Sequence, residues 1–379
     1  MTAAKPSLAL LRKMSDEAVL RSLMDSPRLT RAELAVMTGL SKPTTGEAIR
    51  RLEAAGLVRD TGERTTSRGG VGTYYALAEE IGVALAMSIA PEGVVAEALD
   101  AAGTIISSAA RPVRRPAEPA GVTIALRRAA RDVLGSRQAR TAAVSVASPV
   151  DKRTGDLVHL PDEPFLVDAM APATTLAPLV AGPILVDNDV NWAARAEQAA
   201  RADGSPDGKA SDFVYLYLGE GIGCAVVTDG QVRRGHSGLA GEIAHVCVRG
   251  PDAQAVPLIA MFGQLGLRHA DSTAIDVDRL LSRLPDRGDH AFAVILAAAI
   301  SGVLDAAVAF ADPEFIVIGG SWGSAILTEL RAAVAQRPRT VALEPPLDRD
   351  NPFLTGARTA AVDALRDHVI AGHLRSGRA

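Results

Sequence analysis

The first 57 residues hold short amphipathic patterns whose apolar positions recur every three or four residues, as in helices. The first pattern spans residues 16–24. The second begins at Thr30, and the spacing from Thr30 to Glu33 is that of a capping box, in which each side chain satisfies a free backbone N–H group. Gly39 supplies a break after this pattern. We therefore expect two consecutive helices with a sharp turn after the second.

A third helix is expected to begin at Ser41, a residue type that caps helix N-termini. Pro43 falls in the first turn, where a missing N–H group has no cost. Ile49 and Leu52 would form the buried face of this helix. Two helices joined by a short turn that contains glycine are typical of the helix-turn-helix, which places its second helix in the major groove of DNA.

Two strand-like segments, residues 58–60 and 74–77, follow the third helix and flank a tip rich in Gly and Arg. This pattern predicts a β-hairpin wing whose arginines reach phosphate or the minor groove. Lys and Arg bind phosphate oxygens or guanine edges, and Thr contacts phosphate or a thymine methyl group. The candidate DNA contacts are Lys42, Thr44, Thr45, Arg50, Arg64 and Arg68. The alternative is a small helical interaction module with a solvated, charged face.

From Ile81 onward, the pattern changes to strands alternating with helices. The first series is a three-stranded meander followed by a helix and a strand, and a second series starts near residue 184. The expected strands lie at residues 83–89, 94–99, 104–108, 141–146, 184–186, 213–218 and 224–228, with a helix at 122–134. This order predicts an α/β fold with two lobes around a cleft, and such a cleft is the default position for a ligand.

Composition and charge support a folded protein of two or three domains, with 379 residues of which 48% are hydrophobic. The first 75 residues hold 12 Lys and Arg against 8 Asp and Glu, so a segment of net charge +4 precedes a remainder of −8. A basic segment on an acidic body suggests that only this segment meets a polyanion. Two cysteines provide no disulfide framework, the N-terminus lacks a signal-peptide pattern, and the apolar run at 291–304 is too short to span a bilayer. We expect a cytoplasmic protein without membrane association.

Several ordered motifs carry a resemblance to the ROK family (repressors, open reading frames, kinases), which joins sugar kinases to sugar-responsive repressors. The N-terminal segment, called the head below, resembles the winged DNA-binding domain of the regulator branch through LSKPTT at residues 40–45 and through its Gly-rich wing. The motifs of the larger part are DNDVN at 187–191, GEGIG at 219–223, GHSGLAGEIAH at 235–245, DPE at 312–314 and IVIGG at 316–320.

The resemblance implies an actin-like, sugar-kinase (ribonuclease H-like) fold for residues 79–379. Under this interpretation, residues 1–78 form the winged helix-turn-helix domain and residues 79–186 form the first lobe. A C-terminal helix at 355–379 would complete that lobe, and residues 187–354 would form the second.

The residues at the expected phosphate-binding turns argue against kinase activity. Family kinases open the first lobe with an Asp and a glycine-rich turn, whereas residues 81–91 hold no acidic residue and no glycine after Gly82. Pro91 offers no N–H group to a phosphate. Glu220 stands where kinases carry a Thr, and like charges about 4 Å apart cost roughly 4 kcal/mol at an effective dielectric near 20. We therefore expect no ATP cofactor, no catalytic residues and no enzyme activity.

The resemblance assigns sugar-hydroxyl contacts to Asn188, Asp189, Glu242 and His245, and it maps the kinase base to Asp189. Amide and carboxylate groups suit this task, because they make paired hydrogen bonds with neighbouring hydroxyls. The alternative makes Asp189 a helix cap and Glu242 with His245 a structural pair.

The family's zinc site is expected to be lost. It is built from the same His and three cysteines, but after Cys247 no further cysteine occurs, and a structural zinc site needs four ligands. We therefore expect no metal. Ile259 replaces a Glu that is a further sugar contact in the family, so an apolar wall would favour a modified or less polar sugar, or the pocket has lost ligand binding.

The leading hypothesis is a transcriptional regulator, a repressor by preference, that acts as a homodimer or a dimer of dimers. Its two heads would bind half-sites of a palindromic operator in double-stranded DNA. A sugar or sugar derivative between the lobes would alter the head spacing. The alternatives are a ROK-type sugar kinase with a DNA-binding head and a DNA-binding regulator that needs no ligand.

Overall fold

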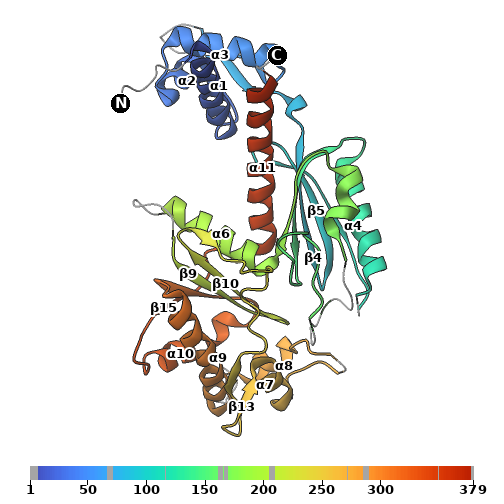
Figure 1. Cartoon of the computed structure of the whole chain (residues 1–379), viewed down its shortest axis with the longest axis vertical. Coiled ribbons are helices and arrows are strands. Elements are labelled where there is room, and N and C mark those ends of the chain that lie inside the picture. The colour runs from blue at the N-terminus through green and yellow to red at the C-terminus, as the bar shows by residue number, and fades with distance from the viewer. Residues whose placement is uncertain are drawn as a thin grey trace.

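The computed structural model describes residues 7–65, 71–115, 117–160, 165, 170–204, 210–270, 272–284, 290–348 and 350–376. Figure 1 shows three parts in series: a small head that contains the N-terminal helices, a first lobe around β4 and β5, and a second lobe around β9 and β10. One long helix, α11 (Pro352–Ser376), runs from the junction of the lobes up to the head.

The head is a winged helix-turn-helix. Its helices are α1 (Leu8–Met24), α2 (Arg31–Thr38) and α3 (Lys42–Ala54), and its sheet has the order β1-β3-β2, with β1 (Leu29–Thr30), β2 (Val58–Arg64) and β3 (Thr73–Leu77). The wing is the antiparallel pair β2 and β3. The first helix was predicted at residues 16–24 and is longer in the structure. It begins at Leu8, where the side chain of Ser7 caps it.

The predicted turn chemistry of the head is confirmed. The side-chain oxygen of Thr30 accepts from the backbone N–H of Glu33, and the Glu33 carboxylate accepts from the backbone N–H of Thr30. Gly39 has a φ of 68°, a left-handed conformation that glycine adopts without strain. Ser41 caps α3, which fixes the angle between the two helices of the motif.

The first lobe is a mixed sheet with the order β6-β5-β4-β7-β8. Strands β4, β5 and β6 form the predicted antiparallel meander, and β7 and β8 add in parallel to β4. Helix α4 (Pro119–Leu134) packs on β5 and β6, while α11 packs on β4 and β7. The strands are β4 (Val83–Ala90), β5 (Gly93–Leu99), β6 (Ile105–Arg111), β7 (Ala139–Val146) and β8 (Ile184–Asn188). Beside β8 lie the short helical turns α5 (Pro172–Leu176) and η2 (Ala177–Leu179).

The second lobe repeats this plan with the sheet order β11-β10-β9-β14-β15. Its strands are β9 (Phe213–Leu218), β10 (Ile222–Thr228), β11 (Gln231–Val232), β14 (Phe315–Gly319) and β15 (Ala342–Glu344). Its helices are α6 (Asp189–Gly204), α7 (Leu258–Gln264), α8 (Val277–Arg283), α9 (His290–Ala311) and α10 (Gly323–Val334), and a small sheet joins β12 (Cys247–Arg249) to β13 (Ala255–Pro257). The predicted two-lobed α/β organisation is confirmed.

Helix α9 is the one helix in the described part of the chain that is long and apolar enough to cross a membrane. It packs into the second lobe, with 56% of its most apolar window buried and with Leu296, Ile300 and Leu304 inside the core. Its apolar character is therefore explained by the core of the lobe.

The head and the first lobe share one hydrophobic core. A single cluster of buried side chains joins Leu20 of α1 and Ile49 of α3 to Leu99 of β5 and to Leu365 and Val369 of α11. Burial of apolar surface between the two parts stabilises their relative position. The head is therefore packed against the body, and α11 provides much of the surface on which it rests.

Polar contacts reinforce the same junction. The Arg366 guanidinium of α11 donates to the carbonyl oxygen of Met24 at 2.6 Å and to that of Ala101 at 2.9 Å. His373, near the end of α11, lies 3.1 Å from the Asp16 carboxylate, which also forms an ion pair with Arg51 of α3 at 2.5 Å. These contacts tie the recognition helix to α1 and α1 to α11.

Candidate functional site

A cleft of about 2120 Å³ separates the lobes. This volume exceeds the roughly 300–1,000 Å³ of ordinary small-molecule pockets, so it leaves room for a ligand. Both lobes contribute to its walls, and so does the N-terminal end of α11. Its lining includes Ser88, Pro91, Ser148, Asn188, Asp189, Glu220, Glu242, His245, Ile259 and Phe353.

Asn188 and Asp189 lie where the chain passes from β8 of the first lobe into α6 of the second. Asn188 Nδ2 donates to the carbonyl oxygen of Ser148 at 3.3 Å, and its Oδ1 accepts from the backbone N–H of Val190. Asp189 Oδ1 accepts from the same N–H group at 2.7 Å. Asp189 therefore caps the first turn of α6 while it lines the cleft, so the cap and the ligand contact are compatible.

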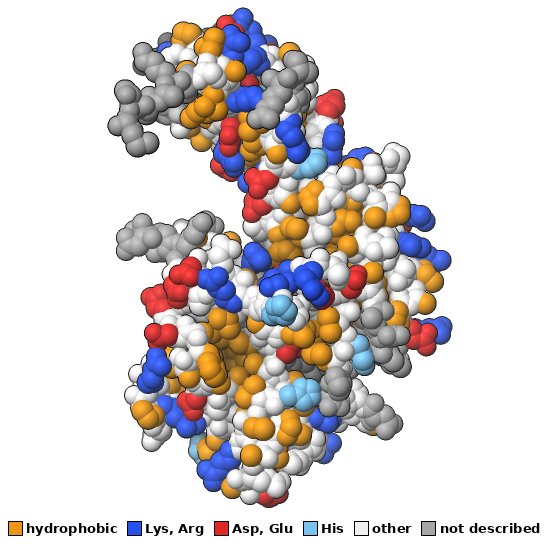
Figure 2. All heavy atoms as spheres, viewed as in Figure 1, with side chains coloured by type: hydrophobic (Ala, Val, Ile, Leu, Met, Phe, Trp, Pro, Cys, Tyr) orange, Lys and Arg blue, Asp and Glu red, His pale blue; other side chains and the backbone are white. Residues whose placement is uncertain are grey.

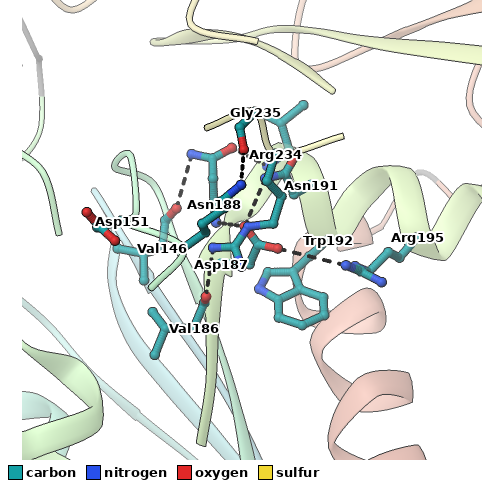
Figure 3. A network of polar contacts seen from close by, with 12 residues as sticks. Val146, Asp151, Val186, Asp187, Asn188, Asn191, Trp192, Arg195, Arg234 and Gly235 are labelled. Atoms are coloured by element: carbon teal, nitrogen blue, oxygen red, sulfur yellow. Dashed lines mark hydrogen bonds and ion pairs between the residues drawn. The ribbon is translucent and has the colours of Figure 1, made fainter. Parts of the chain in front are cut away.

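The buried carboxylate of Asp187 forms polar contacts where the chain passes from the first lobe to the second. Figure 3 shows Asp187 surrounded by Asn191, Arg195 and Arg234. Asp187 is 3% exposed, accepts from Asn191 Nδ2 at 2.8 Å and lies 3.1 Å from Arg234 Nε. Arg234 comes from the segment after β11, so this contact connects the end of a first-lobe strand to the second lobe.

Glu242 and His245 line the cleft from the segment that follows β11, as the motif predicted. This segment passes so close to its neighbours that glycine is required at two positions. A Cβ atom at Gly241 would lie 1.8 Å from the carbonyl oxygen of Cys224, and one at Gly238 would lie 2.1 Å from that of Val150. Both glycines also have positive φ, so the motif fixes the path that brings Glu242 to the cleft.

The environment of Asp189 favours the neutral form of its carboxyl group. Burial, and then the nearby charges of Glu242 and Glu92, raise its pKa to about 7, whereas its backbone hydrogen bonds act in the opposite direction. Burial likewise raises the pKa of the Cys224 thiol to about 12. The centre of the cleft is therefore a place where negative charge is unfavourable without a partner.

Asp189→Asn is expected to stabilise the protein, and more at pH 8 than at pH 5. An unperturbed Asp has a pKa of about 3.9, so the unfolded chain loses this proton first. As the pH rises from about 4 to about 7, the folded state retains a proton that the unfolded state has released, and stability falls until both are ionised. Asn stays neutral, so its advantage grows over this window and is constant above it. Urea unfolding at the two pH values measures it; an equal gain at both would contradict the assignment.

The expectation that Glu220 repels a nucleotide phosphate is only partly met, because Glu220 has a positively charged neighbour. Its carboxylate forms an ion pair with Arg115 of the opposite lobe at 3.0 Å, and the same guanidinium donates to the carbonyl oxygen of Pro91. The expected repulsion of a phosphate by Glu220 is therefore reduced by a neighbouring positive charge. The contact also joins the two lobes across the cleft, a role that the sequence did not reveal.

His245 and Cys247, the two residues retained from the family's zinc motif, lie in different surroundings. His245 lines the cleft, whereas Cys247 is exposed in β12 and pairs with Pro257 in β13. Over the described ranges, no three His, Cys, Asp or Glu side chains are grouped to hold a metal ion. Ile259 is 5% exposed and lines the cleft, so it provides the apolar wall that the sequence predicted.

On the head, the structure changes the set of candidate DNA contacts. Lys42 and Thr44 are exposed at the start of α3, Arg50 is exposed beside Glu47, and Arg64 of the wing is exposed beside Asp60. The prediction for Thr45 was wrong: its side chain is fully buried, and its hydroxyl donates to the carbonyl oxygen of Ser41. Arg68 lies outside the described residues.

Figure 2 shows Lys and Arg side chains over the head, where they accompany exposed hydrophobic side chains. Together with the exposed start of α3 and the wing, this surface is the candidate DNA interface. The fold and the cleft thus define a winged helix-turn-helix protein with a two-lobed, sugar-kinase-like body.

Comparison with known proteins agrees with this class. The ROK family model matches residues 92–259, and a model for winged helix-turn-helix DNA-binding domains matches residues 15–59. The chain thus contains a region similar to the ROK family, preceded by an N-terminal winged helix-turn-helix domain.

Solved structures with similar folds include a ROK family transcriptional regulator, a homologue of the E. coli MLC protein, with a TM-score of 0.65 and 16% identity. The match covers 96% of this chain and 99% of that one. A ROK family glucokinase from Streptomyces griseus, in complex with glucose and AMPPNP, has a TM-score of 0.55 and 19% identity, covering 74% of this chain and all of that one. At these identities, the likeness establishes the actin-like, sugar-kinase fold.

Curated relatives include the bifunctional enzyme NanE/NanK of Brucella suis, 32% identical over 173 residues, which are 43% of this chain and 32% of that protein. The chain thus spans about a third of the length of this relative. The N-acetylmannosamine kinase of Salmonella typhi is 29% identical over 221 residues, which are 55% of this chain and 71% of the kinase.

Proposed function

We propose that the protein is a cytoplasmic transcriptional regulator that binds DNA through its head and a sugar or sugar derivative in its cleft, without kinase activity. It acts as a homodimer or a dimer of dimers that represses transcription from a palindromic operator. The observation that carries the proposal is the placement of α11. Its first residues, Pro352 and Phe353, line the cleft, and its last turns pack against the head.

Helix α11 has 25 residues, which corresponds to a length of about 37 Å. Along this length, it contacts α6 of the second lobe, β4 and β7 of the first lobe, and α1 of the head. A ligand that closes the cleft changes the position of α6 relative to the first lobe and so acts on α11. The ligand shifts DNA affinity only by its differential affinity for the two head positions.

Lys42→Ala is expected to weaken DNA binding about tenfold, similarly on all sequences, and to lower the slope of log affinity against log salt by about one, because its ammonium group contacts a phosphate. Fluorescence anisotropy at several salt concentrations, with duplexes selected by the full-length protein, measures both. Arg21→Ala is the matched control, since Arg21 is 54% exposed on α1 beside Glu17. An equal loss in the control would remove α3 from the interface.

A second candidate function is sugar phosphorylation, and the environment of Asp189 favours it. A carboxyl group with a pKa of about 7 suits a general base at neutral pH, and several relatives are N-acetylmannosamine kinases. Against it stands Pro91 in the turn after β4, which offers no backbone N–H group to a phosphate.

In a coupled assay with ATP, magnesium and a panel of hexoses and N-acetylhexosamines, we expect no turnover above that of Asp189→Asn. Asp189 is the only cleft carboxylate that the family pattern assigns as base, so the variant provides the background rate. Turnover that Asp189→Asn abolishes would establish a kinase and remove the ligand-only role of the cleft.

A further inference from the structure

The first lobe holds a concentration of positive charge that its overall composition conceals. Residues 105–140, which contain β6 and α4, include 8 Arg against 2 Asp and Glu, and they carry a net charge of +6. Residues 76–379 together carry −8, so this positive charge is local. Basic side chains that gather on one surface of an acidic body form a surface suited to a polyanion.

Three of these arginines, Arg127, Arg128 and Arg131, lie together on the outer face of α4. The opposite face of the helix packs on β5 and β6 and is apolar, with Leu126 and Val133 buried. The three arginines are exposed, and their spacing of three and four residues places them side by side along the helix. Lys and Arg side chains also mark the edge of the first lobe at which α4 lies (Figure 1, Figure 2). We call these three residues the α4 arginines.

Within the described ranges of the chain, the side chains of the α4 arginines form no hydrogen bond and no ion pair. The neighbouring acidic residue of the helix, Asp132, is paired with Arg111 at 2.5 Å. The negative C-terminal end of a helix favours positive side chains only within the last turn, which accounts for Arg131 but not for Arg127 or Arg128. Arg127 and Arg131 are also like charges four residues apart, an unfavourable pair on a helix. The folded chain thus leaves this charge unbalanced, so it is available to a ligand.

The last turn of α4 lies on the side of the first lobe that faces the head. The carbonyl oxygen of Val133 accepts from the hydroxyl of Ser107, near the start of β6, at 2.7 Å. The turn that precedes β6 is tied to the head, because Arg366 donates to the carbonyl oxygen of Ala101 in this turn and to that of Met24 at the end of α1. The positive surface of α4 thus begins close to the part of the chain that carries the candidate DNA interface.

We propose that the α4 arginines are a second DNA contact, which binds backbone phosphates of the duplex that flanks the site held by the head. This inference rests on the proposed function, because it adds a surface to the same complex with DNA. A guanidinium group donates paired hydrogen bonds to phosphate oxygens whatever the base, so the contact adds affinity without adding sequence specificity. DNA is favoured over an acidic protein because the head, with a net charge of +4 in residues 1–75, lies on the same side and brings a polyanion there.

Fluorescence anisotropy of the full-length protein with two duplexes tests the proposal. One duplex carries only the operator selected by the protein, and the other adds two helical turns of unrelated sequence on each side. Wild type should bind the extended duplex more tightly. The triple variant Arg127→Gln, Arg128→Gln, Arg131→Gln should bind the short duplex as wild type does. It should bind the extended duplex about tenfold more weakly, with a slope of log affinity against log salt that is smaller by about two to three. Equal binding of both duplexes by wild type, or an equal loss on both in the variant, would overturn the proposal.

The matched control removes the same charge from the second lobe, with Arg233→Gln, Arg249→Gln and Arg339→Gln at exposed positions. This variant should bind both duplexes as wild type does. A loss on the extended duplex as large as that of the α4 variant would show an effect of net charge alone and would contradict a contact. Replacement of the α4 arginines by Lys should keep most of the affinity for the extended duplex, because an ammonium group also binds phosphate. A loss as large as with Gln would also contradict a phosphate contact.

Two further results separate this proposal from the proposed function. Lys42→Ala should weaken binding to both duplexes, because it acts through the head. A protein that binds neither duplex would remove both the regulator and the second contact, whereas a protein that binds both alike would remove the second contact only. An altered association state of the α4 variant, with unchanged binding to both duplexes, would assign the surface to a second copy of the chain and overturn the proposal.

Discussion

Gly356→Ala is expected to lower the free energy of unfolding by about 3 kcal/mol, because it places a methyl group inside the contact between α11 and α6. A Cβ atom at Gly356 would lie 2.0 Å from the carbonyl oxygen of Trp192 and 2.6 Å from its carbonyl carbon. Both are backbone atoms of α6, which cannot rotate away. The two helices must therefore separate, and the end of α11 that lines the cleft moves with them. Urea unfolding measures the loss.

Gly372→Ala is the control on the same helix. Nothing lies within 4 Å of a Cβ atom at this position, so Ala should raise stability by about 0.5–1 kcal/mol through its better helix propensity. The two substitutions thus have opposite expected signs. A similar change for both would mean that the close approach of α11 to α6 does not support the fold. Sugar binding by Gly356→Ala, where the variant folds, reports whether the same contact shapes the cleft.

The local chemistry of the chain was largely predictable. Thr30, Glu33, Gly39 and Ser41 act through neighbours three or four residues away, so their roles follow from spacing alone. The burial of Thr45 was also predictable from helical periodicity. Thr45 precedes Ile49 by four residues and Leu52 by seven, which places it on the buried face of α3. The family motif identified residues of the cleft because it preserves the glycines that direct Glu242 there.

Contacts between distant parts of the chain were not predictable, because no local pattern reports them. Arg115 and Glu220 are 105 positions apart, and each alone has the appearance of an ordinary surface charge. The role of α11 was likewise hidden, since its contacts with the head depend on Arg366 and His373, more than 340 residues from their partners. The sequence located the components of the cleft and of the head, whereas their connection required the three-dimensional structure.

Arg51→Ala is expected to destabilise the protein by about 3 kcal/mol and to loosen the head from α11. Arg51 of α3 pairs with Asp16 at 2.5 Å, and Asp16, 4% exposed, also contacts His373. Removal of one partner leaves a buried carboxylate incompletely paired, which is more costly than the pair is favourable. Arg21→Ala removes the Arg21–Glu17 pair on α1, in which the Arg21 side chain is 54% exposed, and should change stability by less than about 1 kcal/mol.

The loss caused by Arg51→Ala should depend on pH in a direction fixed by Asp16. Burial opposes the charge of Asp16, but hydrogen bonds from His373 and Arg51 outweigh it and hold its pKa below the ordinary value. A lowered pKa adds stability that is complete above about pH 4 and is lost as the pH falls through the folded-state value. The difference between wild type and variant should therefore be largest near neutral pH and shrink in acid. Urea unfolding at pH 7 and near pH 3 measures it, and a difference that grows in acid would show that the ion pair does not hold the head. Because the same pair joins the recognition helix to α1 and α11, the variant should also lose the effect of the ligand on DNA affinity while it still binds DNA.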